Sequence, residues 1–348
     1  MVFPKIKVPV LQNRVFDDQN EAKNSDFGFI SIKKNNKSGI YENELFDSSK
    51  IIYDSNYDNE QSNSLVFRNH LASIIELMIP YINNKKVIEV GCGKGHFFDM
   101  LISKGIDCLG CDPTYTGNSK RIVKKFFSNE LNLSGDFIIL RHVLEHIQDP
   151  ISFLKMINEV NGKCALIYIE VPDFNWIIKN QTYFDIFYEH VNYFRPIDFQ
   201  NIFDSIIDQG LVFGGQYQYV IANLESIKNP PYQFGLEDDV NPISFLKLKD
   251  LAENLTLSKK KIFIWGAASK GVVLAMHLDS LGVPIENLID ININKQNKYI
   301  PITGIRVISP QEFIQQNTSA ILVIANPNYE NEIKSLTAEL NDISYIVV

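Results

Sequence analysis

Cysteine is scarce in this chain, and its placement argues against a zinc site. The 348 residues include four cysteines, Cys92, Cys108, Cys111 and Cys164, and none precedes Cys92. Cys108 and Cys111 have C-x-x-C spacing, but no second pair completes a metal site. All four lie within expected strands or a glycine turn. We therefore expect reduced core or turn residues in a cytoplasmic protein.

Long apolar runs and an excess of positive charge are also missing. No apolar run approaches the ~20 residues of a membrane span. The first 13 residues carry lysines without the apolar stretch of a secretory signal, so we expect no such signal. The net charge of −8 disfavours nucleic acid or an anionic membrane as the main partner. A local basic pocket could still bind phosphate.

Helix-like and strand-like segments alternate from residue 62 onward. Leu65, Leu71, Ile74, Ile75 and Met78 recur at helical spacing, and Ser64 is placed to cap that helix. Strands are expected at 86–90, 106–112, 135–140 and 164–172, with helices at 96–105 and 151–160. This alternation predicts an α/β protein with a doubly wound parallel sheet.

A second α/β unit is expected after a linker. Residues 229–242 contain three prolines and have the composition of a linker, and strand-helix alternation resumes near residue 261. We expect three parts: an N-terminal extension over 1–62, a first α/β domain over 63–230 and a second over 231–348. Residues 1–60 are polar, so we expect irregular structure there, with room for a hairpin.

Three glycines on alternate positions follow the strand at 86–90. Gly91, Gly93 and Gly95 allow a sharp turn and the close approach of a ligand to the backbone. Strand, glycine turn and helix in this order are typical of a nucleotide-binding βαβ unit. The dinucleotide fingerprint requires glycine where His96 stands, which argues against NAD.

Two acidic residues lie close to the glycine turn. Asp112 ends the second strand, where a carboxylate can accept both hydroxyls of a ribose; an exposed turn residue before Pro113 is the alternative. Glu89 lies inside an apolar strand, and a lone buried charge is costly. We expect a donor on the ligand or on the loop to satisfy Glu89.

A cluster of histidines follows the strand at 135–140. His142 and His146 are four residues apart with Glu145 between them. Metal ligation is conceivable, but the order H-V-L-E-H differs from the H-E-x-x-H of zinc proteases. We expect no metal.

Together, "VIEVGCGKG", the acid at 112 and "LRHVLEHIQDP" resemble class I S-adenosylmethionine-dependent methyltransferases. The resemblance implies S-adenosyl-L-methionine as cofactor, with the glycine turn around its methionine part and Asp112 on its ribose. The cofactor-binding residues that it implies are Glu89, Gly91, Cys92, Gly93, Gly95, Asp112, Arg141 and His142.

The segment "YFDIFYEHVNYFRP" over 183–196 is either an aromatic core helix or part of an active site. It is similar to the "Y-x-E-H-x-x-Y-F" signature of sugar C-methyltransferases, which act on nucleotide-linked keto-deoxysugars. That resemblance implies His190 as general base, Glu189 as an active-site acid and Tyr193 nearby. His146 is a further catalytic candidate. Phe187 replaces the tyrosine of the signature, and Tyr188 stands next to it.

The turn "WGAASKGVVL" over 265–274 fits neither a P-loop nor a dinucleotide fingerprint. With "KQNKYIPITG" over 295–304, it resembles the C-terminal domain of the same sugar methyltransferases. The resemblance implies pyrophosphate binding at a helix N-terminus beside Lys270. The implied substrate-binding residues are Tyr57, Tyr188, Gly266, Lys270 and Lys295. We expect no counterpart of the cysteine-rich zinc module found at the start of many relatives, because no cysteine precedes Cys92.

These observations predict a methyltransferase acting on carbon of a nucleotide-activated sugar, in polysaccharide or secondary-metabolite biosynthesis. O- or N-methylation of a sugar or related small molecule is the alternative within the class. A dinucleotide-dependent oxidoreductase and a non-catalytic binding protein are the alternatives outside it. We expect neither nucleic acid nor membrane as partner, and a homodimer is one assembly open to the chain.

Overall fold

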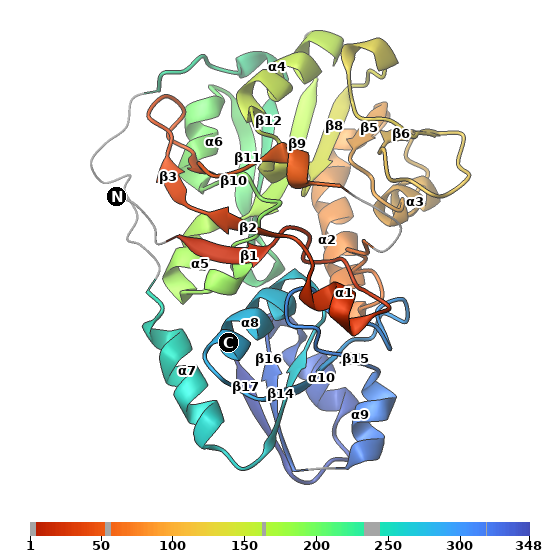
Figure 1. The fold of residues 1–348 in the computed structure, drawn as a ribbon. Helices are drawn as coiled ribbons and strands as arrows, with labels where there is room; N and C mark the ends of the chain where they lie inside the picture. Colours follow the sequence, from red (N-terminus) through yellow and green to blue (C-terminus); the bar gives the residue numbers. More distant parts are fainter. Residues whose placement is uncertain (1–4, 53–56, 162–164, 233–243, 318) are drawn as a thin grey trace.

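The computed structural model describes residues 5–52, 57–161, 165–232, 244–317 and 319–348. Two β-sheets dominate it, a seven-stranded sheet in the upper half of Figure 1 and a five-stranded sheet in the lower half. Cys164 and most of the expected linker lie outside the described residues. The other three cysteines are free and buried.

The seven-stranded sheet has the order β11-β12-β9-β8-β5-β6-β7. Its strands are β5 (Val87–Val90), β6 (Cys108–Cys111), β7 (Ile122–Val123), β8 (Phe137–Arg141), β9 (Leu166–Pro172), β11 (Ile206–Val212) and β12 (Tyr217–Asn223). The five strands from β9 to β7 pair in parallel, which confirms the doubly wound α/β class. The antiparallel strands β12 and β11 extend one edge of this sheet and were not predicted.

Five helices accompany this sheet: α2 (Leu65–Ile82), α3 (His96–Ser103), α4 (Pro150–Asn161), α5 (Phe174–Asn180) and α6 (Pro196–Ile202). Ser64 caps α2 as predicted, since its Oγ accepts the Phe67 amide at 3.4 Å. By length and composition α2 could cross a membrane, but Leu71, Ile74 and Met78 are buried in the core of the fold. Leu65 was expected on this apolar face, but it begins the helix and is 55% exposed.

The five-stranded sheet is parallel throughout, with the order β15-β14-β13-β16-β17. Its strands are β13 (Lys261–Trp265), β14 (Ile285–Ile289), β15 (Val307–Ile308), β16 (Ala320–Ile324) and β17 (Ile343–Val347). The helices of this part are α7 (Leu246–Leu257), α8 (Ser269–Ser280), α9 (Pro310–Gln316) and α10 (Glu330–Leu336). We propose domain boundaries at the positions expected from the sequence.

The N-terminal segment is more regular than its composition suggests. β1 (Ile6–Pro9) pairs with β2 (Phe27–Ile30), and α1 (Gln19–Lys23) lies between them in sequence. β3 (Ile32–Lys34) and β4 (Tyr41–Asn43) form a small sheet with β10 (Asn192–Tyr193). Buried residues of β1 and β2 share an apolar cluster with α8 and with residues 183–193. Figure 1 shows β1 and β2 crossing between the two large sheets.

Candidate active site

The glycine turn after β5 has the backbone geometry that its sequence predicts. Gly91, Gly93 and Gly95 have φ of +76°, +56° and +86°, a region that favours glycine. A Cβ at Gly91 would clash with the Val143 side chain, whereas a Cβ at Gly93 would meet no described atom within 4 Å. Gly91 is therefore required by protein packing, while Gly93 leaves an open face for a ligand.

Asp112 lies directly beside this turn. One of its carboxylate oxygens accepts the Gly93 amide at 2.8 Å, and the other accepts the Thr114 amide at 2.7 Å. The residue is only 8% exposed, which contradicts the alternative of an exposed turn residue. The carboxylate is thus fixed against the glycine turn, and its remaining lone pairs can accept ribose hydroxyls.

The Glu89 carboxylate, beside the same turn, is incompletely hydrogen-bonded by the described residues. It is 3% exposed, and its Oε2 has no hydrogen-bond partner among the described residues. Burial raises its pKa to about 7, although Arg141 acts in the opposite direction. A cationic donor on a ligand would satisfy this oxygen, and the α-ammonium group of S-adenosylmethionine is such a donor.

Cys92 and Arg141, two further residues implied in cofactor binding, point largely into the protein. Cys92 is buried, and burial raises the pKa of its thiol, so it offers backbone groups rather than a thiolate. The Arg141 guanidinium stacks on the Phe97 ring at 4.5 Å and donates to Glu170 at 3.0 Å.

Residues 57–64, called the strap here, pair with the glycine turn and with the start of α3. Lys94 and His96 of the turn pair with Asp58 and Glu60, each at 2.9 Å. Asp58 also accepts from Asn294 of the C-terminal part at 3.1 Å. The strap therefore joins the two sheets beside the expected cofactor site.

The histidine cluster after β8 lies at the floor of a cavity. His142 has φ of +51°, and its two ring nitrogens face Glu145 at 3.3 Å and Glu170 at 3.1 Å. Burial lowers the pKa of His142, but the two carboxylates outweigh burial and raise it to about 9. His142 is therefore an imidazolium at neutral pH.

The Glu189–His190 pair lies opposite this cluster. His146 Nδ1 is 2.9 Å from the Glu189 backbone oxygen, and its ring centroid is 4.8 Å from that of His190. The Tyr57 hydroxyl donates to the Glu189 carboxylate at 2.9 Å. The adjacent residues Glu189 and His190 therefore contact different groups. The His190 ring packs against the His146 imidazole, and the Glu189 carboxylate accepts from the Tyr57 hydroxyl.

The surroundings of His190 shift its pKa far from the ordinary value of 6.5. Burial, and then the adjoining His146, lower its pKa to about 3, although Glu145 raises it. His190 is consequently neutral at neutral pH, the form that can accept a proton.

Two tyrosines implied as site residues do not line the cavity. Tyr188 is buried under the N-terminal segment, where its ring packs on Gly28 and its hydroxyl accepts the Asp47 amide at 3.0 Å. Tyr193 lies in β10, and its hydroxyl donates to the Phe187 backbone oxygen at 3.2 Å. Both tyrosines are buried and hydrogen-bonded within the protein, so their positions support the shape of the segment.

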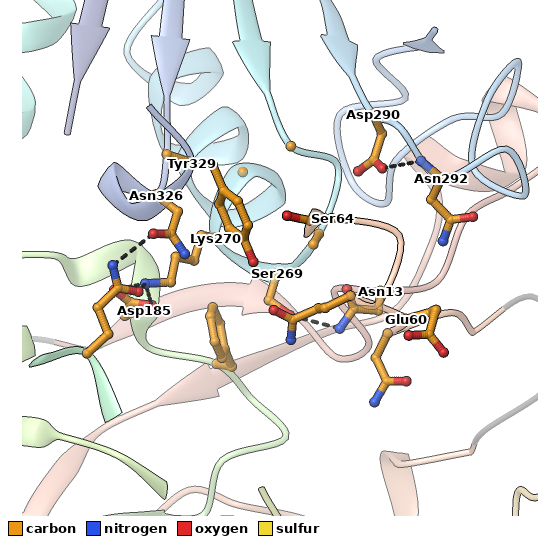
Figure 2. Close-up of a pocket in the computed structure, with 18 of the residues that line it drawn as sticks. Asn13, Glu60, Ser64, Asp185, Ser269, Lys270, Asp290, Asn292, Asn326 and Tyr329 are labelled. Carbon is orange, nitrogen blue, oxygen red and sulfur yellow. Dashed lines mark hydrogen bonds and ion pairs between the residues drawn. The ribbon is translucent and has the colours of Figure 1, made fainter. Parts of the chain in front are cut away.

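The cavity extends from the histidine cluster to the turn after β13. Residues from the first sheet, the strap and the second sheet all line it, among them Tyr57, His142, Glu145, His146, Asp185, Phe187, Glu189, His190, Gln216, Gly266, Ser269, Lys270, Asp290, Lys295, Asn326 and Tyr329. Figure 2 shows its second-sheet end, where Ser269 and Lys270 lie close to Tyr329 and Asn326. The strap contributes Glu60 and Ser64 from the other side.

Lys270 is the second residue of α8 and is already paired. Its ammonium lies 2.8 Å from Asp185, donates to Gln216 at 2.7 Å and lies over the Trp176 ring at 4.9 Å. These partners belong to the first half of the chain, so Lys270 links the two halves across the cavity. Residues at the start of α8 line the cavity, and the Ala268 side chain does not cap the helix.

Lys295 and Gly266 shape the turn after β13. Lys295 is buried and donates to the Ala267 backbone oxygen at 3.0 Å. Gly266 has φ of +107°, and a Cβ on Gly271 would clash with the Gly266 oxygen. Asp290 accepts the Ala267 amide at 2.7 Å. This acid repeats, at the end of β14, the position that Asp112 takes after β6.

Metal ligation was considered for His142 and His146, but the structure groups His146 with Glu145 and His190 instead. Glu145, His146 and His190 place ligand atoms within 4.8 Å of one another. Glu145 already faces the His142 imidazolium, which would oppose a cation at the same carboxylate. We therefore keep the expectation that no metal is needed.

Glu170, Asp185 and Asp290 were not among the predicted site residues, although all three contact the groups above. Glu170 carries the same signal as Glu89, an acid inside an apolar strand, and this signal could have identified it. Asp290 follows β14 as Asp112 follows β6, so its strand-end position was a usable signal, whereas Asp185 becomes recognisable only through its contact with Lys270.

Two family models match the chain. One, described as a methyltransferase domain, matches residues 66–206, and the other, described as a C-methyltransferase C-terminal domain, matches residues 235–345. The chain is an S-adenosylmethionine-dependent methyltransferase of the C-methyltransferase type. S-adenosylmethionine is its cofactor.

Individual relatives are similar to parts of the methyltransferase. A tRNA U34 carboxymethyltransferase of Dichelobacter nodosus (strain VCS1703A) is 31% identical over 87 residues, which is 21% of this chain and 28% of the relative's length. A SAM-dependent methyltransferase structure from Archaeoglobus fulgidus has 18% identity and a TM-score of 0.36, covering 45% of this chain and 94% of that one. The structure of the Burkholderia thailandensis 1,6-didemethyltoxoflavin-N1-methyltransferase has 13% identity and a TM-score of 0.35, covering 47% of this chain and 79% of that one.

Proposed function

We propose that this methyltransferase methylates a carbon atom beside the ketone of a nucleotide-activated deoxysugar, with His190 as general base. The observation that carries the proposal is the cavity shared by the two halves of the chain. One end of it holds His190, Glu189 and His146, and the other holds the turn before α8.

The two ends of the cavity suit the two unlike ends of a nucleotide sugar. At the histidine end, Tyr57, Phe187 and Glu189 offer an apolar wall and hydrogen-bonding groups for a sugar ring. At the other end, the N-terminus of α8 favours negative charge, and Lys270 stands in its first turn. A pyrophosphate there would share Lys270 with Asp185.

The protein groups at the histidine end can carry out the proton transfer. Neutral His190 accepts the proton from the carbon beside the ketone, and the electron pair left on that carbon forms the enolate. When bound, S-adenosylmethionine supplies the methyl group; the new C–C bond forms as the methyl–sulfur bond breaks. The Glu145 carboxylate favours the imidazolium that His190 becomes, and the enolate charge adds to this effect. Holding donor and acceptor in line provides much of the acceleration.

Deuterium exchange tests both the acceptor atom and the base. The enzyme is incubated in D2O with nucleotide-linked keto-deoxysugars, first without and then with S-adenosylmethionine. We expect exchange of the hydrogen beside the ketone, followed by methylation at that carbon, and loss of both in His190→Asn. Methyl transfer to a hydroxyl or amine without any exchange would instead establish the O- or N-methyltransferase alternative.

A further inference from the structure

Glu170 is a fully buried carboxylate near the end of β9 that does not line the cavity. It is 0% exposed, and four polar groups surround it. The Tyr168 hydroxyl donates to it at 2.6 Å, and Arg141 donates at 3.0 Å. His70 Nε2 and His142 Nε2 lie at 3.2 Å and 3.1 Å. Helix α2, strand β8 and the loop after β8 thus converge on one side chain.

A line of three charged side chains runs from the buried Glu170 through His142 to Glu145, which lines the cavity. His142 lies between Glu170 and Glu145, with one ring nitrogen facing each carboxylate. Both contacts are within ion-pair distance, and a carboxylate on each side of the ring favours the imidazolium form of His142. Arg141 and His70 contact Glu170 rather than His142, while the Tyr217 ring packs on His142 at 4.5 Å.

Glu145 is the last member of this line before the base. It is 1% exposed, its carboxylate faces His142, and its ligand atom lies within 4.8 Å of those of His146 and His190. Turning His142 away would release Glu145 from its position beside the two histidines of the cavity.

We propose that Glu170 is a positioning residue for catalysis, which holds His142 so that Glu145 faces His190. This inference rests on the proposed role of His190 as general base. A purely stabilising ion pair would be complete with Glu170 and Arg141. It would not account for the strained backbone of His142, whose φ of +51° is costly for a residue with a side chain.

The test uses Glu170→Gln, which removes the charge while keeping the size of the side chain. Two measurements are made on the full-length protein: the 15N resonances of its six histidines, with His142 assigned from the signal lost in His142→Asn, and kcat at saturating cofactor and sugar substrate. We expect His142 to be doubly protonated at pH 8 in the wild type and neutral in Glu170→Gln. Residues that orient a functional histidine typically cost ~10- to 100-fold when replaced, and we expect kcat to fall by that amount.

Asp198→Asn is the matched control. Asp198 is also fully buried and pairs with a buried arginine, Arg195, at 2.7 Å, but it does not line the cavity. This variant should lose thermal stability and keep its kcat, which separates general damage from loss of positioning.

A doubly protonated His142 in Glu170→Gln, or an unchanged kcat, would overturn the inference. Normal turnover in His190→Asn would instead defeat the proposed base, while the histidine resonances would still report on Glu170. If Glu170→Gln does not fold, Tyr168→Phe replaces it, because losing the 2.6 Å hydrogen bond frees Glu170 to turn. An unchanged kcat in that variant would also overturn the inference.

Discussion

Replacing Glu89 by glutamine should stabilise the cofactor-free protein and weaken cofactor binding at the same time. Burial holds the folded-state pKa of Glu89 at about 7, against an ordinary value of 4.5. A raised carboxyl pKa adds stability below pH 4.5, and this stability is lost as pH rises through 7. The difference between these two pKa values, at about 1.4 kcal/mol for each pKa unit, corresponds to a cost of about 3.5 kcal/mol for the ionised residue.

The assay is thermal unfolding of wild type and Glu89→Gln from pH 5 to pH 9 without cofactor, together with calorimetric titration of S-adenosylmethionine. We expect the melting temperature of the variant to exceed that of the wild type at pH 8 and the difference to shrink toward pH 5. Cofactor affinity should fall about tenfold or more, because a charge-assisted hydrogen bond contributes ~1.5–3 kcal/mol.

Glu76→Gln is a suitable control, since its side chain is 59% exposed and pairs only with Lys104 among the described contacts that involve it. It should change neither quantity. A variant at Glu89 that is no more stable than wild type at pH 8, or that binds the cofactor equally well, would refute the assignment of its carboxylate to the ligand.

Three further outcomes are expected. Asp112→Ala should weaken S-adenosylmethionine binding roughly 10- to 150-fold by calorimetry, and unchanged affinity in a folded variant would remove Asp112 from the ribose site. Lys270→Met should raise KM for the nucleotide sugar and lower the melting temperature, because Asp185 loses its cation; a KM equal to that of wild type would exclude a phosphate role. Treatment with a chelator should leave turnover unchanged, and activity restored only by a divalent metal would show that Glu145 and its histidine neighbours hold an ion.

The parts of the structure that the sequence predicted depend on neighbours in the chain. The positive φ of Gly91, Gly93 and Gly95, the cap at Ser64 and the strand-helix alternation all follow from local patterns. Asp112 is likewise set by its place at a strand end. Features of this kind depend on interactions between residues only a few positions apart in the sequence.

The parts that sequence could not provide depend on contacts between distant segments. The pKa of His190 depends on burial beside His146, which is 44 positions away in sequence. Tyr188 points inward because the N-terminal segment packs over it, a contact that no local pattern shows. The Glu170 network joins residues 100 positions apart. Edge strand β11 carries a weak alternation in which glycine and charged residues obscure the apolar face.

The most direct test of the account is the fate of the methyl group on a nucleotide-linked keto-deoxysugar, followed by NMR of the product with wild type and His190→Asn. We predict a new C–C bond beside the ketone for the wild type. Turnover should fall ~100- to 10,000-fold in the variant, the usual cost of losing a general base, with cofactor affinity nearly unchanged. Methylation at oxygen or nitrogen, or near-normal turnover in His190→Asn, would contradict it.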